Sequence, residues 1–366
     1  MRAIKNFDWL LLAAALILTS LGIAFIWSST HWDPARSGAP AAQQFRWFGV
    51  SLLALLAFLS FDYSRLTYLA YPVYLLVAVG LALVLVPRIG VEHQNARRWI
   101  EYGGFSIQPS EFMKVAVVLA LARCLMYRKL GRGAGELVAP LLIGLVPMAL
   151  ILAEPDLGTA LVLLPTLFAM LYVAGARPRH LLALVAMGFA AAPVMWFFVM
   201  GKAQRGRVTA FLSPQADLRG AGWHLRQSLA AVSSGGVTGI GFSSGSPVVL
   251  NRGFAAHTDF IFAVIANEWG FLGALAVLLL LFLILSRGIE IASSTREPFG
   301  RLVVVGVLTS LGFQALVNIA MTVRLCPITG ITLPFVSYGG SSLLICFVMA
   351  ALVLNVGMHR KAVFAP

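Results

Sequence analysis

Long apolar runs separated by short polar stretches make up most of this chain of 366 residues. An α-helix needs roughly 20 predominantly apolar residues to cross the hydrocarbon core of a bilayer. We therefore expect spanning helices at about 9–28, 45–61, 68–87, 110–126, 137–153, 157–174, 181–200, 258–286, 302–323 and 341–358. The strict alternation that a membrane β-barrel needs is absent. The pattern predicts an all-α integral membrane protein with about ten transmembrane helices, in a single domain over residues 1–366.

The composition excludes two other classes of protein. Only 11% of the residues are charged and 60% are hydrophobic, whereas an ordinary soluble domain has about 25% charged residues. So few charges cannot cover a soluble surface, and so many apolar residues would not leave the chain disordered. Three cysteines, two of them inside apolar runs, give no sign of a disulfide framework.

Lysine and arginine are denser in one set of alternate loops, which includes both ends of the chain. The positive-inside rule places that set, and therefore the N- and C-termini, in the cytoplasm. The longest polar stretch, about 201–257 between the seventh and eighth predicted helices, then forms a large extracytoplasmic loop. Long loops escape the positive-inside rule, so its own positive charge does not change this orientation.

This extracytoplasmic loop carries a single acid, Asp217, against several basic residues. The basic residues are Lys202, Arg205, Arg207, Arg219, Arg226 and Arg252. A basic surface outside the cytoplasm favours an anionic partner, either lipid headgroups or phosphate groups. The glycine- and serine-rich residues 233–246 could present backbone N–H groups to an anion, although plain turns are the simpler interpretation.

Acidic residues inside or beside the apolar runs are unusual, because an ionisable side chain at membrane depth costs roughly 2.5–3.5 kcal/mol. Acids in such positions are Glu111, Glu154, Asp156, Asp259 and Glu268. Glu111 lies three residues before Lys114, so the two share one helix face and can form an ion pair. That pair either locks two helices together or contributes to a functional site. Glu154 and Asp156 flank Pro155 in a tight hairpin, where acids and proline are also common turn residues.

Asp259 directly follows the basic loop and opens the eighth predicted helix. A carboxylate there is either a helix N-cap, favoured by the helix dipole, or a general base at the membrane surface. Burial would raise its pKa and neighbouring arginines would lower it, and the sequence leaves open which effect dominates. Glu268 falls on roughly the opposite helix face, so we expect it to pack against or cap another element.

Several short motifs occur in a fixed order between the predicted helices. They are RWI at 98–100, QPSE at 108–111 with Lys114, EPDLGT at 154–159, QRGRV at 204–208, GAGWH at 220–224 with Gln227 and Ser228, SGG at 234–236, HTDFIF at 257–262 and LPFVSYGGSS at 333–342. By these motifs the chain resembles the SEDS family (shape, elongation, division and sporulation), and its RodA branch more than its FtsW branch.

The resemblance implies a peptidoglycan glycosyltransferase that polymerises lipid II at the outer face of the cytoplasmic (inner) membrane. Its expected partners are lipid II, the growing glycan strand, a class B penicillin-binding protein and membrane lipids, with no nucleic acid. Asp259 matches the family's essential aspartate. Glu111 and Lys114 match a membrane-embedded ion pair near a cavity that opens to the outer face in that family. Further polar positions around that cavity are matched by Arg98, Asp156, Arg205 and Arg207.

The sequence departs from the family pattern near the expected catalytic aspartate. RodA-like chains commonly carry an acid shortly before the His-Thr-Asp segment, whereas residues 252–256 here read RGFAA. Asn267 also stands where an acid is expected. No cofactor is assigned with certainty, and a divalent cation (Mg²⁺ or Mn²⁺) held by clustered carboxylates is less well supported than in the family.

The reaction that the resemblance implies joins two lipid-linked disaccharides with inversion at the anomeric carbon. Asp259 is the candidate general base. Arg205 and Arg207 are the first candidates to bind the pyrophosphate, because guanidinium groups suit phosphate oxygens, and Arg98 and Lys114 come next. His257 could orient Asp259, relay a proton or simply pack.

Two other functions remain open at this point. A lipid II flippase or transporter would also have about ten spans with charges inside the membrane. Against it, no inverted repeat is visible and the polar positions gather toward the outer face. The third interpretation is a catalytically silent scaffold that recruits a transpeptidase, which the missing acid before His257 supports.

Overall fold

The computed structural model describes residues 6–31, 38–86, 90–93, 96–102, 105–128, 134–213, 220–244 and 255–359. Its α-helices are α2 (Trp9–Thr30), α3 (Ala39–Leu59), α4 (Leu66–Val84), α5 (Pro109–Leu125), α6 (Val138–Ala153), α7 (Leu157–Val173), α8 (Pro178–Val194), α9 (Lys202–Leu212), α10 (Ala221–Ser234), α11 (Ile261–Glu268), α12 (Gly270–Ser294), α13 (Pro298–Thr322) and α14 (Gly340–His359). Short 3₁₀ helices lie at Tyr63–Arg65 and Ala134–Leu137, and a π-helix at Met195–Val199 extends α8.

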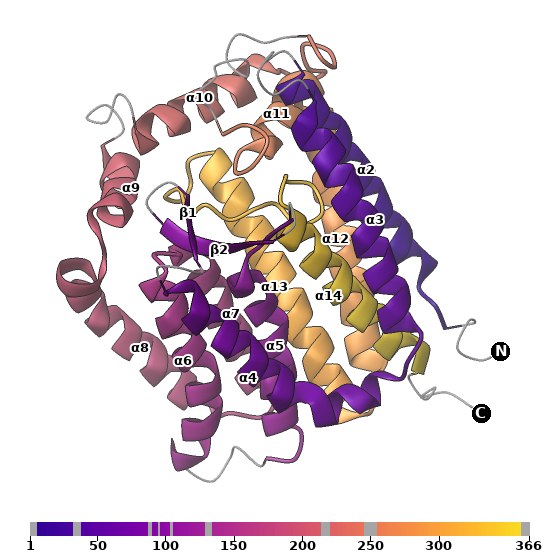
Figure 1. The fold of residues 1–366 in the computed structure, drawn as a ribbon, viewed down its shortest axis with the longest axis vertical. Coiled ribbons are helices and arrows are strands. Elements are labelled where there is room, and N and C mark those ends of the chain that lie inside the picture. Colours follow the sequence, from indigo (N-terminus) through magenta and orange to yellow (C-terminus); the bar gives the residue numbers. More distant parts are fainter. Residues whose placement is uncertain are drawn as a thin grey trace.

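The helical membrane fold predicted from the apolar runs is confirmed. Within the described ranges, 8 helices are long and apolar enough to cross a membrane. Two more predicted runs correspond to α5 and α7, which have 17 residues each. The number of spans therefore stays a prediction, as does the orientation. The start of α2 and the end of α14 lie at the same end of the bundle (Figure 1).

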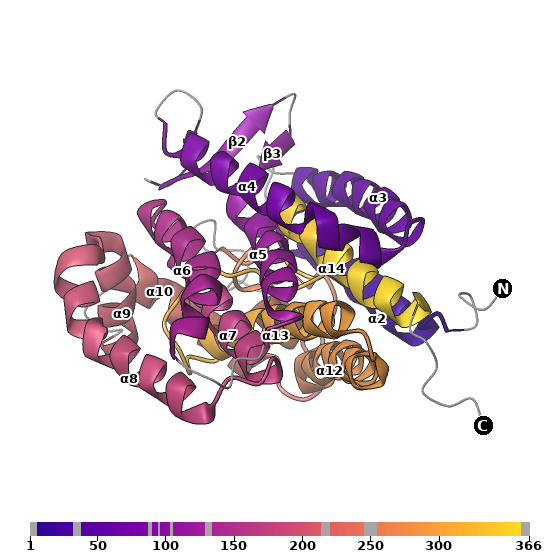
Figure 2. The same cartoon turned by 90° about the horizontal axis from the view of Figure 1, so that it is seen from below.

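Two helices form the centre of the bundle. α14 is buried on nearly all sides and packs against α3, α5 and α13, and α5 is almost as fully enclosed (Figures 1 and 2). A helix that is apolar all round and enclosed by other helices belongs to the core. Among the described residues of α8, by contrast, none is buried, so this helix lies at the edge of the bundle with most of its apolar side chains exposed.

The eighth predicted run is not one helix, which corrects the prediction. α11 ends at Glu268 and α12 begins at Gly270, because Gly270 adopts φ +65° and breaks the helix. A Cβ at Gly270 would collide with the backbone of Val237 and Gly239. The glycine-rich segment therefore forms turns that pack against this break, with Phe271 N donating to Gly236 O at 2.9 Å. The turn interpretation is thus correct for residues 235–244, whereas 233 and 234 end α10, and 245 and 246 lie outside the described residues.

The stretch 201–257 is not a simple loop, because it contains α9 and α10. Both helices are short and polar, so a search for long apolar runs could not show them. On α10 the buried residues Gly222, Leu225, Ser228 and Ala231 recur every three positions and form one packed face. Arg219, Arg252 and Asp217 lie outside the described residues.

A small antiparallel sheet also departs from a purely α-helical fold. Its strands β1 (Val91–His93), β2 (Ala96–Tyr102) and β3 (Phe105–Ile107) pair in that order. The sheet lies beside the helical bundle rather than inside it (Figure 2). Its role in the site is to carry Arg98 on β2.

Candidate active site

Asp259 lies in the turn at residues 256–260, directly before α11. The N-cap of α11 is Phe260, so the alternative in which Asp259 caps a helix is wrong. The residue is partly buried. Burial raises the pKa of its carboxyl group to about 6, while Arg207 and Arg98 act to lower it. Of the two opposing effects, burial is therefore the larger.

Arg207 reaches the same place from α9. Its Nη1 donates to the backbone oxygen of Thr329 at 3.3 Å. A Cβ placed on Gly330 would lie 3.5 Å from Nη1 of Arg207 and 3.8 Å from Oδ2 of Asp259. The cation and the carboxylate thus converge on a glycine with φ +75°. A cavity of about 160 Å³ adjoins Arg207 and is otherwise lined mostly by apolar side chains, among them Leu161.

Arg98 and Asp156 form the neighbouring part of the site. Arg98 Nη1 lies 3.9 Å from Asp156 Oδ1, while its Nε donates to Glu154 O at 3.1 Å and its Nη2 donates to Pro155 O. Asp156 is the N-cap of α7 and accepts hydrogen bonds from Thr159 N and Oγ1 at 3.2 and 2.9 Å. The hairpin between α6 and α7 is therefore tied to β2 by an arginine.

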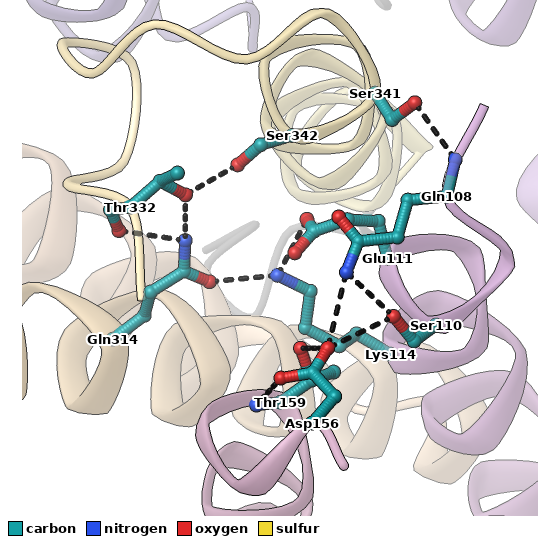
Figure 3. Close-up of polar contacts among 10 residues, drawn as sticks. All are labelled: Gln108, Ser110, Glu111, Lys114, Asp156, Thr159, Gln314, Thr332, Ser341 and Ser342. Atoms are coloured by element: carbon teal, nitrogen blue, oxygen red, sulfur yellow. Dashed lines mark hydrogen bonds and ion pairs between the residues drawn. The ribbon is translucent and has the colours of Figure 1, made fainter. Parts of the chain in front are cut away.

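Asp156 also connects this hairpin to α5. Gln108 Nε2 and Ser110 Oγ donate to Asp156 Oδ2 at 3.0 and 3.3 Å. Figure 3 shows the side chains of Gln108, Ser110 and Thr159 turned toward the carboxylate of Asp156. A buried carboxylate with this many donors is held in one orientation.

The ion pair predicted on α5 forms. Lys114 Nζ lies 2.7 Å from Glu111 Oε2, and both side chains are almost completely buried. Lys114 Nζ also donates to Gln314 Oε1 at 2.8 Å (Figure 3). With two oxygens bound, this ammonium group is less available to a substrate than Arg207 is.

Two of the predicted site residues have other contacts. Arg205 donates from Nε to Met200 O at 2.9 Å and from Nη2 to Phe197 O at 3.0 Å, so its guanidinium group holds the π-helical end of α8. The backbone oxygen of His257 accepts a hydrogen bond from Tyr338 N at 3.0 Å. The centroid of the His257 ring lies 5.6 Å from that of the Tyr338 ring. A role of Arg205 beside Arg207, or of His257 in orienting Asp259, therefore stays a prediction.

The acid and the amide around the helix break are structural. Glu268 accepts hydrogen bonds from Ser28 Oγ and, at 3.2 Å, from Ser243 N, which agrees with the packing role predicted for it. Asn267 Nδ2 donates to Ala231 O at 3.0 Å and to Ser234 Oγ at 2.7 Å, so it joins α11 to α10. Residues 252–254 of the stretch that lacks the expected acid lie outside the described residues.

Sequence reasoning missed the buried amides on α13. Gln314 contacts Lys114, and Asn318 Nδ2 donates to the backbone oxygen of Asp259 at 2.9 Å. The sequence signal was available, since two uncharged amides four residues apart in an apolar helix need hydrogen-bond partners. For the described residues, no three His, Cys, Asp or Glu side chains lie together as a metal site, and the sequence assigns no cofactor with certainty.

Glu154 has an environment unlike that of the other acids. It is 1% exposed, and neither of its carboxylate oxygens has a hydrogen-bond partner among the residues that the structure describes. Burial and the nearby Asp156 raise the pKa of Glu154 to about 8, against the lowering effect of Arg98. The side chain is therefore mainly protonated at pH 7.

Glu154→Gln should stabilise the protein, and more strongly as the pH rises. The carboxyl has an ordinary pKa of 4.5 when unfolded and about 8 when folded. Between these values the native state retains a proton that the unfolded chain releases, which lowers the free energy of unfolding by about 1.4 kcal/mol per pH unit. Thermal unfolding in detergent at about pH 5 and pH 8 measures this, and parallel changes in both proteins would contradict it.

The fold and the site together define a class: a multi-pass helical membrane protein in which Asp259, Arg207, Arg98 and Asp156 lie close enough to act electrostatically on one another. The family described as cell cycle protein, comprising FtsW, RodA and SpoVE, matches residues 8–362. The chain belongs to this family, which confirms the resemblance seen in the sequence motifs.

Known proteins resemble the chain over almost its full length. The probable peptidoglycan glycosyltransferase FtsW of Geobacter sp. (strain M18) is 36% identical in sequence to this chain, and the alignment covers 99% of each of the two chains. A chain solved in work on the structural coordination of polymerization and crosslinking by a peptidoglycan synthase complex superimposes with a TM-score of 0.83 at 33% identity, covering 97% of this chain and 99% of that one. The rod shape-determining protein RodA of Thermus thermophilus gives a TM-score of 0.72 at 33% identity, covering 97% of both chains.

Proposed function

We propose that this protein is a peptidoglycan glycosyltransferase of cell-wall synthesis, which joins lipid II disaccharide units into glycan strands. The observation that carries the proposal is the convergence of Asp259 and Arg207 on the space beside Gly330. A carboxylate and a guanidinium group that lie close to the same glycine can serve a nucleophile and a phosphate leaving group at once. Family membership and the name of the Geobacter relative support the same activity.

The proposed reaction uses Asp259 as the general base. An acceptor sugar hydroxyl oxygen attacks the anomeric carbon of the donor, and its proton passes to the Asp259 carboxylate. The new carbon–oxygen bond forms as the bond from the anomeric carbon to the pyrophosphate oxygen breaks. The polyprenyl pyrophosphate departs with the electron pair, and one displacement inverts the anomeric configuration. A pKa of about 6 leaves Asp259 mostly ionised at neutral pH, as a base requires.

Arg207 is the residue best placed to stabilise the leaving pyrophosphate. Its planar guanidinium group matches phosphate oxygens, and the apolar cavity beside it suits the adjoining part of a lipid chain. Arg98 is the second candidate, since it also acts electrostatically on Asp259. Lys114 is already bound to Glu111 and Gln314, so we assign it to holding the site together.

The proposed setting is the cytoplasmic membrane, with the site facing outward. Lipid II would keep its tail in the bilayer while its headgroup enters the end of the bundle where α9, β2 and the turn before α11 meet. The chain that superimposes with a TM-score of 0.83 was solved in work on a peptidoglycan synthase complex that coordinates polymerization and crosslinking. We accordingly propose a class B penicillin-binding protein as the partner that crosslinks the growing strand.

Arg207→Ala should weaken donor use and shift the pH profile. Without the guanidinium group, the pyrophosphate loses its main cation, so the KM for the lipid-linked donor rises. The same change removes the main effect that lowers the pKa of Asp259, so the acid limb of kcat/KM moves to higher pH. Initial rates across a pH series measure both effects, and an acid limb at the wild-type position would argue against the electrostatic effect of Arg207 on Asp259.

The test of the proposed function is incubation of the purified protein with lipid II in detergent, with and without EDTA. A polymerase produces glycan strands under these conditions, whereas a flippase cannot show transport without a membrane and a scaffold produces nothing. Strands made by the protein alone, separated on a gel, are the expected result. Absence of product with added Mg²⁺ or Mn²⁺ and with a penicillin-binding partner present would contradict the proposal.

A further inference from the structure

Residues 329–332, here called the 329–332 segment, are part of the connection between α13 and α14. Side chains from three helices bind its polar groups. These contacts are Arg207 Nη1 to Thr329 O (3.3 Å), Asn318 Nδ2 to Ile331 O (2.7 Å), Gln314 Nε2 to Thr332 O (3.0 Å) and Thr332 Oγ1 (3.1 Å), and Thr332 Oγ1 with Ser342 Oγ (2.7 Å). The segment is therefore held from α9, α13 and α14 at once.

Asn318 joins this segment directly to the turn that carries the catalytic aspartate. It is completely buried, and its Nδ2 donates both to Asp259 O at 2.9 Å and to Ile331 O at 2.7 Å. Its Oδ1 is also buried, and no described residue offers it a hydrogen bond. An unpaired buried acceptor costs free energy, so an apolar side chain of similar size would suit the packing better. The amide is explained by what its nitrogen holds together.

Gln314 makes the corresponding link to the ion pair. It lies one helical turn before Asn318 on the same face of α13. Its Oε1 accepts from Lys114 Nζ, and its Nε2 donates to Thr332 (Figure 3). Both side chains thus bind the 329–332 segment with their amide nitrogens. Gln314 binds Lys114 through its oxygen, whereas Asn318 binds the Asp259 backbone through the same nitrogen.

We propose that Gln314 and Asn318 are positioning residues that hold Asp259, Arg207 and Lys114 in one fixed arrangement through the 329–332 segment. The inference rests on the proposed function, and it adds residues that neither touch the reacting atoms nor carry charge. Asp259 needs such support because it lies in a turn, where its backbone oxygen accepts from a side chain instead of a helical N–H group.

Loss of this support should lower the rate of the chemical step more than it weakens substrate binding. A misplacement of about 1 Å in a catalytic group can cost about 100-fold in rate. Asn318→Leu keeps the size of the side chain and removes both hydrogen bonds. We expect kcat to fall about 10- to 100-fold, with little change in the KM for the donor, in a protein that still purifies as a folded monodisperse species.

Ser310→Ala is the matched control on the same helix. Ser310 is buried on α13, and its hydroxyl group has no hydrogen-bond partner in the described part of the chain. The control should retain the kcat of the wild type. A kcat for folded Asn318→Leu equal to that of the control would overturn the proposal.

Gln314 keeps the proposal testable if Asn318→Leu does not fold. Gln314→Glu still accepts from Lys114 but cannot donate to Thr332, whereas Gln314→Leu loses both contacts. We expect kcat to fall in both, and further in Gln314→Leu; a wild-type kcat in Gln314→Leu would overturn the proposal. Wild type and Asp259→Ala are assayed in parallel, so that failure of the proposed function (no product from wild type, or full activity of Asp259→Ala) is distinguishable from failure of the positioning role.

Discussion

Asp259→Ala abolishes glycan polymerisation by the purified protein if the carboxylate is the general base. General base catalysis by a positioned carboxylate contributes about 10²- to 10⁴-fold to a rate, so kcat should fall by at least about 10²-fold. Folding should be unaffected, because the fold uses the backbone oxygen of Asp259, which accepts from Asn318 and remains in the variant. Burial disfavours the ionised form of the Asp259 carboxyl group, as its raised pKa indicates, so the fold does not depend on that charge.

Glu268→Gln provides the control for this experiment. Glu268 is a second buried acid in the same stretch of chain, and it bonds Ser28 and Ser243 away from the site. Glutamine retains an oxygen acceptor there, so polymerisation should continue at close to the wild-type rate. Equal rates for Asp259→Ala and Glu268→Gln would show that the base has been assigned to the wrong residue.

Lys114→Met should produce the largest loss of stability. Removing one partner of a buried ion pair leaves the other charge uncompensated, which typically costs about 3–5 kcal/mol. Lys114 and Glu111 are both buried, and Lys114 Nζ also satisfies Gln314 Oε1. We expect a clear fall in the thermal unfolding midpoint in detergent.

A second ion pair with the same spacing supplies the comparison. Arg287 and Glu290 pair at 2.6 Å with 31% and 55% of their side chains exposed, and an exposed pair contributes only about 0–1 kcal/mol. Glu290→Gln should therefore change the midpoint little. The double variant Glu111→Gln/Lys114→Met should be more stable than Lys114→Met alone, since no charge is left unpaired. The single variant Glu111→Gln completes the comparison. If the losses of stability in Glu111→Gln and Lys114→Met simply added up in the double variant, the ion pair would not be the source of the effect.

The parts of the fold that the sequence predicts are those governed by one long pattern or by local spacing. The predicted apolar runs are mainly helical, because a backbone in lipid must satisfy its own hydrogen bonds, although the eighth is divided between α11 and α12. The Glu111–Lys114 pair follows from a three-residue spacing on one helix. The motifs that carry the family resemblance also marked Asp259, Arg207, Arg98 and Asp156, which lie close enough to interact electrostatically; their functional roles stay predictions.

The features that the sequence does not predict depend on contacts between distant segments. The break between α11 and α12 exists because Gly270 packs against the turn at 237–239, which no local pattern shows. α9 and α10 are too short and polar to appear as apolar runs. Arg205 and Arg207 are two residues apart, so on a helix they point in different directions: one binds the end of α8 and the other faces Asp259.

The buried amides on α13 are a third kind of feature that is not predicted from the sequence. Gln314 and Asn318 carry no charge, so the rule that flags ionisable residues in membranes passes over them. Their importance appears only when the structure brings the 329–332 segment and the turn at Asp259 beside α13. Polar side chains of every kind in apolar helices therefore need to be followed to their partners.

An experimental structure of Asp259→Asn with a lipid-linked donor and an acceptor sugar bound would test directly whether Asp259 and Arg207 act together on the two substrates. The substitution preserves the shape of the side chain and should stop turnover, so that both substrates stay in place. The proposed mechanism predicts the pyrophosphate against the Arg207 guanidinium group and an acceptor hydroxyl within about 3.2 Å of the residue 259 side chain. A pyrophosphate bound elsewhere, with no sugar hydroxyl able to reach position 259, would contradict it.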